Sequence, residues 1–479
     1  MLNYDLVVFS HLRWDFVFQR PQHLLSRAAR ERRVFFVEEA VHGAIAVPRL
    51  NVTLDPSGVV VCVPQLPFGT SEEAGLEMTA ALIDGFLRLE QSREYVLWFY
   101  TPMALPAANR LRPRAIVYDC MDELSNFKFA PPVLRERELE LLDRADVVFT
   151  GGQSLWEAKR TQHANCFAMP SSVDAPHFAR ARRGLREPED LAAIPHPRVG
   201  FCGVVDERMN LELLAGVASA LPDVHFVILG PVVKIDPNGL PHGENLHYLG
   251  QKSYDVLPRY LAHWDVAMMP FAINDSTRFI SPTKTPEYLA AGKPVVSTPI
   301  RDVVSPYADL DLVLIGHDIP SFAAAVRAVL EEDQSERRSR ADAFVGEMSW
   351  DVTWRKMEDA ISSCVARRSR LGLSPATGVP RPMPIDQGLA NSVAPNSTFF
   401  RPTSPASTAS NPAKPAPVPV PSSIQLPLPV RPINPVAART GTSSSSSNLR
   451  LDAPSSERAV RSISSTQASV PRSGTGNGG

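Results

Sequence analysis

The feature that most constrains the fold is an alternation of short apolar runs with amphipathic segments of helical period. Runs of four to six apolar residues have the length of buried strands, and the segments between them have the length of helices. Strands joined in this way by helices form parallel βαβ units. In the first block of the chain, the expected strands lie at 6–10, 34–37, 59–63, 95–99, 115–118 and 147–150.

A second block with the same alternation begins near residue 195. A segment rich in Arg, Glu and Pro, around residues 180–195, separates the two blocks, as expected for an exposed linker. We therefore predict an α/β chain with one Rossmann-like domain at 1–180 and another at 195–345. The strands expected in the second block lie at 199–204, 225–229, 246–249, 266–270, 294–297 and 312–315.

The chain changes character after the second block. Residues 350–368 carry apolar side chains at helical spacing and predict one more amphipathic helix. Residues 374–479 hold 18 of the 45 prolines, a run of serines, and nine Lys/Arg against three Asp/Glu. Such a segment buries too little apolar surface to offset its chain entropy. We predict a disordered tail that acts as a linker or as a docking segment for a protein partner.

Charge and cysteine usage limit the classes of partner and compartment. The formal net charge of −2 gives no overall attraction to nucleic acid. The five cysteines are scattered, without metal-ligand spacing, which favours a reducing compartment and no bound metal. The N-terminus lacks the basic and apolar regions of a signal peptide, and no apolar stretch approaches the ~18–20 residues of a membrane span. We expect a cytoplasmic protein, either free or in peripheral contact with the inner face of the membrane.

The most informative candidate site follows the strand expected at 266–270. A polar loop leads into Ser281-Pro-Thr-Lys-Thr-Pro286, which predicts a helix that starts near Pro286, since proline suits the first helical position. The unpaired N–H groups of a helix start, together with Lys284, would suit a diphosphate. Glu287 could accept hydrogen bonds from ribose hydroxyls. The alternative is ordinary helix capping with a solvated Lys284–Glu287 pair.

Residues 281–296, SPTKTPEYLAAGKPVV, resemble the donor-binding signature of group 1 (glycogen-synthase-like) glycosyltransferases of the GT-B fold. Residues 169–178, 200–214, 248–271 and the Trp-Asp pair at 350–351 resemble further elements of that family. The resemblance covers about residues 1–368. It implies two facing Rossmann-like domains, a C-terminal cross-over helix, and a metal-independent hexosyltransferase that uses a nucleotide-diphosphate sugar as co-substrate and needs no cofactor.

The resemblance also implies a set of donor-binding residues. The common form of the family has two glutamates eight residues apart, the first of which contacts the sugar. In this chain Phe279 occupies the position that partners Glu287, so Asp275 or Arg278 would have to replace that contact. The expected donor-binding residues are Gly203, Arg208, Lys252, Arg278, Ser281, Thr283, Lys284 and Glu287.

Two segments of the first block supply candidates on the acceptor side. Residues 10–24 follow the first strand and contain His11, Trp14 and Arg20. Arg20 at a helix start could contact a phosphate or an anionic acceptor, whereas Trp14 could instead pack under the loop.

Asp119 and Asp122 follow the strand at 115–118. Clustered carboxylates would raise one another's pKa and suit proton transfer, and the alternative is a solvated acidic turn. The expected catalytic residues are Asp122 and His11, and the expected acceptor-side residues are Trp14, Arg20 and Asp119.

Residues 118–123, together with 20–24 and 97–102, resemble a bacterial subgroup linked to cell-surface polysaccharides. This implies transfer of a hexosyl group to a saccharide or lipid-linked acceptor. The family resemblance favours retention of configuration, and an inverting route would use His11 as the base. Two other functions fit the same shape: a nucleotide-sugar 2-epimerase, and a non-catalytic scaffold that acts through its tail.

Overall fold

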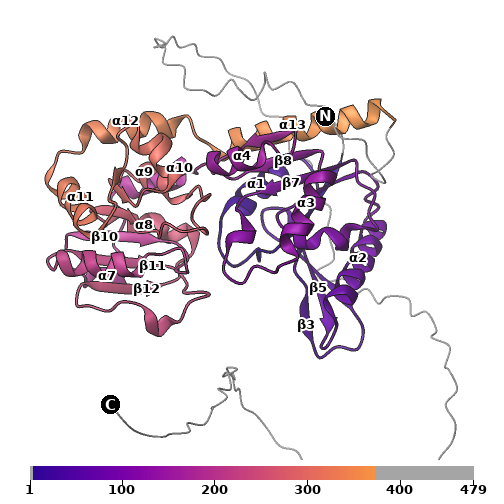
Figure 1. Cartoon of the computed structure of the whole chain (residues 1–479), viewed down its shortest axis with the longest axis horizontal. Helices are drawn as coiled ribbons and strands as arrows, with labels where there is room; N and C mark the ends of the chain where they lie inside the picture. Colours follow the sequence, from indigo (N-terminus) through magenta and orange to yellow (C-terminus); the bar gives the residue numbers. More distant parts are fainter. Residues whose placement is uncertain (1–3, 373–479) are drawn as a thin grey trace, which may run out of the picture. The chain divides into compact units, whose positions relative to one another are not determined.

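The computed structural model describes residues 4–372, so the tail predicted at 374–479 lies outside the described residues. The first sheet follows the order β3-β5-β2-β1-β6-β7-β8-β9, with β4 paired to β5 (Figure 1). Its strands are β1 (Asp5–Ser10), β2 (Val34–Glu38), β3 (Val41–Gly43), β4 (Arg49–Leu54), β5 (Val59–Pro67), β6 (Tyr95–Phe99), β7 (Ala115–Cys120), β8 (Val147–Thr150) and β9 (Cys166–Ala168).

The second sheet follows the order β12-β11-β10-β13-β14-β15, and every pairing in it is parallel. Both sheets therefore have the topology that alternating strands and helices predict. The strands of the second sheet are β10 (Arg198–Cys202), β11 (His225–Leu229), β12 (Leu246–Gly250), β13 (Val266–Met269), β14 (Val295–Ser297) and β15 (Leu314–Ile315).

Most of the helices lie between consecutive strands. The longer ones are α1 (Arg20–Ala28), α2 (Glu72–Leu89), α3 (Leu134–Arg144), α7 (Leu211–Ala220), α11 (Ile319–Glu331), α12 (Ser335–Gly346) and α13 (Trp350–Arg370). The shorter ones are α4 (Gln153–Lys159), α5 (Ala175–Phe178), α6 (Glu189–Ala192), α8 (Leu257–Ala262), α9 (Lys284–Ala290) and α10 (Arg301–Val303). No helix within residues 4–372 is both long and apolar enough to cross a membrane.

One part of the first sheet departs from the predicted parallel pattern. Strand β4 runs antiparallel to β5, from Arg49 opposite Gln65 to Leu54 opposite Val60. In β4 only Leu50 and Val52 are buried, so one face of the strand packs on the protein and the other is exposed. Such a half-buried edge strand lacks the continuous apolar run by which the predicted strands were found. The three-residue strands β3 and β9 were missed as well, because they are too short to show such a run.

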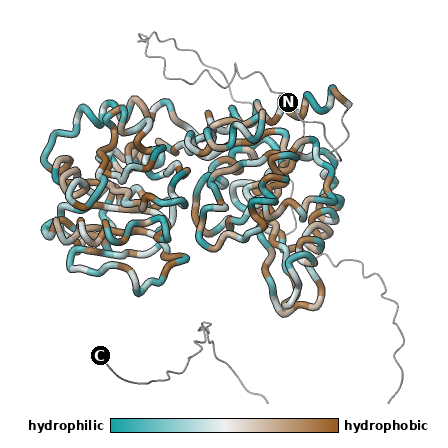
Figure 2. The backbone as a smooth tube through the Cα atoms, viewed as in Figure 1, coloured by the Kyte–Doolittle hydropathy of each residue, from teal (hydrophilic) through white to brown (hydrophobic). Residues whose placement is uncertain are grey.

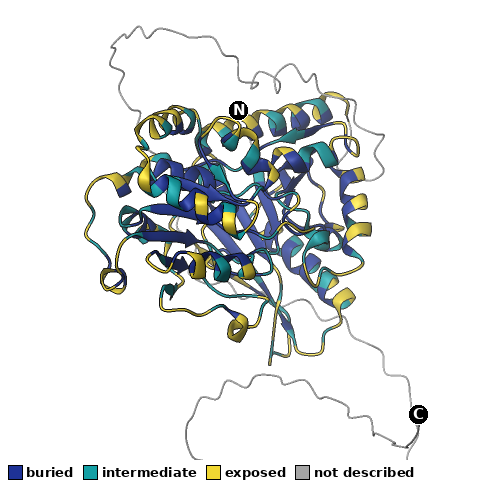
Figure 3. Ribbon diagram, turned by 60° about the vertical axis from the view of Figure 1, so that its left-hand side comes forward, coloured by how far each residue is buried: buried dark blue, intermediate teal, exposed yellow. Residues whose placement is uncertain are grey.

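The two sheets have separate hydrophobic cores. Figure 3 shows buried strands inside and exposed residues on the outer faces of the helices, and Figure 2 shows the matching apolar colouring of the strands. One core extends from Val173 to Val345 and surrounds the second sheet. Two further clusters cover the opposite faces of the first sheet, as expected for parallel strands buried on both sides.

Helix α13 returns the chain to the first sheet, where it packs against α1, β7 and β8 (Figure 1). Trp350, Trp354, Met357 and Ile361 recur at helical spacing and are almost completely buried there. Near its end, Arg368 Nη1 lies 2.8 Å from Asp146 Oδ1 in a buried ion pair. The amphipathic pattern predicted for 350–368 is thus the contact face of this helix.

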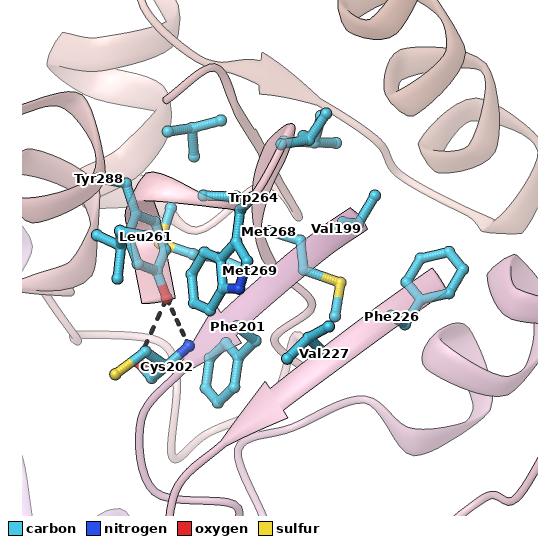
Figure 4. Packing of buried hydrophobic residues seen from close by; sticks show 14 of the residues in the cluster. Val199, Phe201, Cys202, Phe226, Val227, Leu261, Trp264, Met268, Met269 and Tyr288 are labelled. Carbon is cyan, nitrogen blue, oxygen red and sulfur yellow. Dashed lines mark hydrogen bonds between the residues drawn. The ribbon is translucent and has the colours of Figure 1, made fainter. Parts of the chain in front are cut away.

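In the core of the second sheet, helix α9 packs against the carboxyl end of β10. In Figure 4 the hydroxyl of Tyr288 on α9 lies against Cys202, the last residue of β10. It accepts a hydrogen bond from the Cys202 N–H at 2.8 Å. The neighbouring Gly200 leaves room for the indole of Trp264, because a Cβ at residue 200 would lie 2.0 Å from that ring. These contacts fix α9 relative to the end of β10.

We predict that Trp354→Ala lowers the free energy of unfolding by about 3–5 kcal/mol, because it leaves a large cavity between α13 and the first sheet. The Trp354 ring is stacked on Trp98, with ring centres 6.4 Å apart. Urea unfolding followed by tryptophan fluorescence and circular dichroism measures the change. Val352→Ala, at a position 38% exposed on the same helix, is the control and should change stability by less than about 0.5 kcal/mol. Equal losses in the two variants would contradict the assigned packing.

Candidate active site

Each sheet has one point at which the strand order reverses. In the first sheet the chain moves outward on one side of β1 and then resumes with β6 on the other side. In the second sheet β10 and β13 have the same relation. Ligands of open α/β sheets bind beyond the carboxyl ends of the strands at such switch points. The residues that follow these four strands therefore form the candidate active site.

His11 follows β1 at the first switch point. Burial and, to a smaller extent, the charge of Lys234 lower the pKa of His11 to about 4, although a hydrogen bond with the Tyr100 backbone opposes the shift. Its Nδ1 atom is buried and has no hydrogen-bond partner within residues 4–372. The imidazole is therefore neutral near pH 7 and is able to accept a hydrogen bond.

Asp122 lies just beyond β7, at the same edge of the first sheet. Burial raises the pKa of its carboxyl to about 6, while Arg208 and Arg20 act against this shift. Asp206 raises the pKa and Lys234 lowers it, so charges from the second half reach this carboxylate. The structure thus brings the predicted residues Asp122 and Arg208 into electrostatic contact.

Arg208 follows β10 at the second switch point. Its Nη2 atom lies 2.7 Å from Asp206 Oδ2, and its guanidinium lies 5.6 Å from the ring centre of Phe127. Lys234 places its ammonium 5.2 Å from the same ring centre. Two cations therefore lie over one aromatic ring, an arrangement in which the ring face attracts positive charge. Sequence reasoning missed Lys234 and Phe127; the positive φ of 62° at Lys234 is a structural signal that the sequence does not display.

Gly203 lies at the carboxyl end of β10, where the backbone makes a close approach. A Cβ at Gly230, which follows β11, would lie 1.7 Å from the Gly203 carbonyl oxygen. Residue 230 also has a φ of 149°, a backbone conformation that would be strained in any residue with a side chain. The floor of the second switch point is thus formed by backbone atoms.

Helix α9 starts earlier than predicted. The expected helix is present but begins at Lys284, so Pro286 is its third residue and the prediction that proline occupies the first helical position is wrong. Thr283 precedes the helix with helical backbone angles and makes no side-chain cap. The reason is that the Ser281-Pro-Thr turn already places residues 283–285 in helical geometry.

Lys284 and Glu287 contact each other on α9. Lys284 Nζ donates to Glu287 Oε2 at 2.6 Å, and both groups are largely removed from solvent. Burial raises the pKa of Glu287, whereas Lys284 and a hydrogen bond from Thr283 lower it. Burial lowers the pKa of Lys284, but the charge and hydrogen bond of Glu287 together with Cys202 leave this pKa above its ordinary value. The alternative of a solvated surface pair is wrong, because this pair is buried.

Arg20 and Asp119, predicted to meet the acceptor, contact each other instead. The guanidinium donates to both carboxylate oxygens at 2.9–3.1 Å, and its Nη1 donates to the Met169 carbonyl at 2.7 Å. Both side chains are buried, at 3% and 0% exposure. Burial lowers the pKa of Arg20, but Asp119, with smaller effects of Tyr100 and Asp122, leaves this pKa above its ordinary value, so the guanidinium stays charged. The prediction of an acceptor contact is wrong for this pair, whose hydrogen-bonding capacity serves the core.

Two other predicted residues lie away from the switch points. Trp14 is buried against Phe36, and its backbone N–H donates to the Glu38 carboxylate, so the alternative of packing under the loop is correct. Lys252 forms an ion pair with Asp190 of α6 at 2.7 Å and lies over the ring of Tyr260. Within residues 4–372 it makes no contact with Lys284 or Glu287, and the prediction that it binds the donor is not supported by its position.

The loop before α9 contacts the first half of the chain. Phe279 packs against the core of the first sheet, next to the exposed Arg278 that lies over its ring. The Asp275 carbonyl accepts a hydrogen bond from Asn126 at 3.1 Å. Ser281 lies so close to Gly152 that a Cβ at residue 152 would come within 2.7 Å of the Ser281 Cβ. Phe279 is thus a packing residue.

No group of three or more His, Cys, Asp or Glu side chains in the described part of the chain is arranged to hold a metal ion. The charged side chains that the candidate site offers are Asp122 beside the first switch point and Arg208 and Lys234 beside the second. This arrangement can neutralise an anion and can orient a hydroxyl group.

Comparison with known proteins agrees with this geometry. Residues 196–332 match the family model "Glycosyl transferases group 1". The second half of the described chain is thus similar to group 1 glycosyltransferases, and the architecture is that of the GT-B fold. The expected α/β architecture is thereby confirmed. The matched segment contains the second switch point, with Arg208 and Lys234, and helix α9.

The individual proteins to which the chain is similar are distant in sequence. The chain is 24% identical over 275 residues, 53% of its own length and 68% of the relative, to TuaH of Bacillus subtilis (strain 168), named as a putative glycosyltransferase of teichuronic acid biosynthesis. The structure of a UDP-forming α,α-trehalose-phosphate synthase from Burkholderia vietnamiensis superimposes with a TM-score of 0.57, at 15% identity, covering 76% of this chain and 99% of that one. HepE from Anabaena, in complex with UDP and glucose, superimposes with a TM-score of 0.51, at 15% identity, covering 75% and 99%.

We predict that Asp119→Ala lowers the free energy of unfolding by about 3–5 kcal/mol, because it leaves the Arg20 guanidinium buried without its partner. Arg30→Ala removes a guanidinium that is 65% exposed and paired with Asp351, and should cost less than about 1 kcal/mol. Chemical denaturation measures both variants. A neutral effect of Asp119→Ala would mean that Arg20 and Asp119 are accessible, as the sequence had suggested.

Proposed function

We propose that this protein transfers a hexosyl group from a nucleotide-diphosphate sugar to a saccharide or lipid-linked acceptor. The observation that carries the proposal is the opposition of Arg208 and Lys234 to Asp122 across the two switch points. Two cations suit a departing diphosphate, and a carboxylate suits an attacking hydroxyl. The UDP-forming synthase and the UDP complex among the structural neighbours support a nucleotide donor.

Arg208 and Lys234 would bind the diphosphate. Both cations lie over Phe127, which follows Asp122 on the same loop of the first half. Arg208 is already paired with Asp206, which fixes its guanidinium at the end of β10. Lys234 makes no ion pair within the described residues, so its full charge is available to a phosphate oxygen. Neutralisation by side chains in this way needs no metal ion, which can be tested by adding a chelator.

Asp122 would orient the acceptor. In the reaction, the bond between the sugar C1 and the phosphate oxygen breaks, and a bond between C1 and the acceptor oxygen forms. The acceptor hydroxyl loses its proton, and the nucleoside diphosphate leaves with the electron pair of the broken bond. In its ionised form Asp122 accepts a hydrogen bond from the acceptor hydroxyl and so raises its nucleophilicity. We favour retention of configuration, with the proton passing to the departing phosphate; in the inverting alternative His11 would take the proton.

The Lys284–Glu287 pair would contribute to the nucleotide end of the donor. It lies on α9, which Tyr288 fixes to the end of β10. Glu287 retains acceptor capacity for ribose hydroxyls, since Lys284 contacts one of its two carboxylate oxygens. Arg208 and Glu287 therefore follow two neighbouring strands of one sheet, β10 and β13.

The biological setting follows from the relative. TuaH is named for teichuronic acid biosynthesis, and this supports a role of the present chain in making a polysaccharide. We further propose that this synthesis takes place at the inner face of the cell membrane. The acceptor would then be a growing saccharide or its lipid-linked form.

We predict that Lys234→Met weakens the binding of UDP or of the preferred nucleotide about tenfold, because it removes one charged partner of the diphosphate. Methionine keeps an unbranched side chain at this positive-φ position. Lys128→Met is the matched control, since Lys128 is exposed and lies over Phe129 on the opposite loop. Calorimetry with UDP and GDP measures the affinities. If Lys234→Met binds as the wild type does, the cationic site is wrongly placed.

We predict an acidic limb near pH 6 in the pH profile of kcat/KM, because Asp122 must be ionised and its pKa is about 6. The raised pKa also means that the folded state binds the extra proton, so this residue stabilises the fold below about pH 4 and loses that contribution as the pH rises through 6. Asp122→Asn should lower kcat/KM about a hundredfold or more and remove the limb. An unchanged profile in Asp122→Asn would rule out this role.

A screen of nucleotide sugars separates the proposed transfer from the two alternatives. Product analysis by NMR would show a released nucleoside diphosphate for a transferase and an epimerised sugar nucleotide for a 2-epimerase. Absence of turnover with every donor would favour a non-catalytic scaffold.

A further inference from the structure

Glu207 lies at the second switch point, in a turn that is held on both sides. The Met209 N–H donates to the Asp206 carbonyl at 3.0 Å, which closes the turn around Glu207. Before the turn, Val205 pairs with Val232, beyond β11; after it, Met209 pairs with Phe271, beyond β13. The position of Glu207 is therefore fixed by all three strand ends that meet at this point.

The two acidic residues of this turn differ in their contacts. Asp206 accepts hydrogen bonds from the Arg208 side chain at 2.7–3.1 Å and from the Arg208 backbone N–H at 3.0 Å. Both carboxylate oxygens of Glu207 are buried, and neither has a hydrogen-bond partner within residues 4–372. A buried acceptor without a donor destabilises the fold, and more so when it is charged. Such a group in a native protein is explained by strain, by a catalytic role, or by a water or an ion that it binds.

The chemistry of the group limits what it can bind. An ionised carboxylate only accepts hydrogen bonds, so its ligand has to donate them. A phosphate or a carboxylate ligand would be repelled. Vicinal hydroxyls of a sugar ring supply two donors at the spacing of two carboxylate oxygens, and hydrogen bonds to a charged acceptor are the stronger ones.

The position of Glu207 indicates which sugar it meets. It is next in sequence to Arg208, which we place at the diphosphate, and the sugar that is transferred is bonded directly to that diphosphate. We propose that Glu207 accepts hydrogen bonds from hydroxyl groups of the transferred sugar and so contributes to the choice of donor. This inference rests on the proposed function and adds a residue that discriminates between sugars.

The test separates the sugar from the nucleotide. Affinities of the full chain for UDP, UDP-glucose, UDP-galactose, GDP and GDP-mannose are measured by calorimetry for the wild type, Glu207→Ala and Glu207→Gln. We expect Glu207→Ala to weaken the preferred sugar nucleotide about tenfold or more while changing the affinity for the bare nucleotide less than twofold. Glu207→Gln should lie between the two, because an amide keeps one acceptor oxygen and loses the charge. Glu212→Gln, an exposed carboxylate in the first turn of α7, is the control and should leave both affinities unchanged.

Thermal unfolding of the same variants tests the structural alternative. Because Glu207 has no partner to lose, Glu207→Gln should unfold at the same temperature as the wild type or at a higher one. A lower melting temperature in Glu207→Gln would show that the carboxylate has a structural partner and would overturn the inference. Equal losses of affinity for nucleotide and sugar nucleotide, or no loss for either, would also overturn it. If the wild type bound no nucleotide, the proposed function itself would fail, and this outcome differs from failure of the Glu207 assignment alone.

Discussion

The buried guanidinium of Arg20 joins four parts of the first half of the molecule. It begins α1, donates to Asp119 at the end of β7, donates to the carbonyl that follows β9, and lies 3.9 Å from the sulfur of Met357 on α13. An ion pair without solvent access is stable only when its remaining hydrogen bonds are satisfied, and here the Met169 carbonyl satisfies one of them. The pair thus ties α1 to the ends of β7 and β9 and adds one contact with α13, whose apolar face packs on the same sheet.

The same ion pair sets the electrostatic environment of the acceptor side. Arg20 lowers the pKa of Asp122, which burial raises to about 6. Arg208 and Lys234 act in the same direction as Arg20 from the second half. Asp122 is therefore poised close to neutral pH by opposing effects, and binding of an anionic diphosphate to Arg208 and Lys234 would raise its pKa further. Occupation of the donor site and the proton affinity of the acceptor site are coupled in this arrangement.

Much of the fold follows from the sequence because its signals are local. The apolar runs, the helical periodicity of α13 and the segment before α9 predict elements from adjacent residues. The site was harder to predict, because its contacts are not local. Arg20 and Asp119 have the chemistry of a binding pair, yet they meet each other across 99 residues and leave nothing for a ligand. Lys234 and Glu207 were missed, since only the folded loops show that one faces Phe127 and that the other has no partner.

The structure of a crystal grown with UDP tests the central claim most directly, because it locates the diphosphate. The account predicts difference density for the phosphates between Arg208 and Lys234, with Phe127 displaced from the two cations and the ribose near Glu287. Phosphate density elsewhere, for example at Lys252 and Arg259 near the linker, would contradict the placement of the active site at the two switch points.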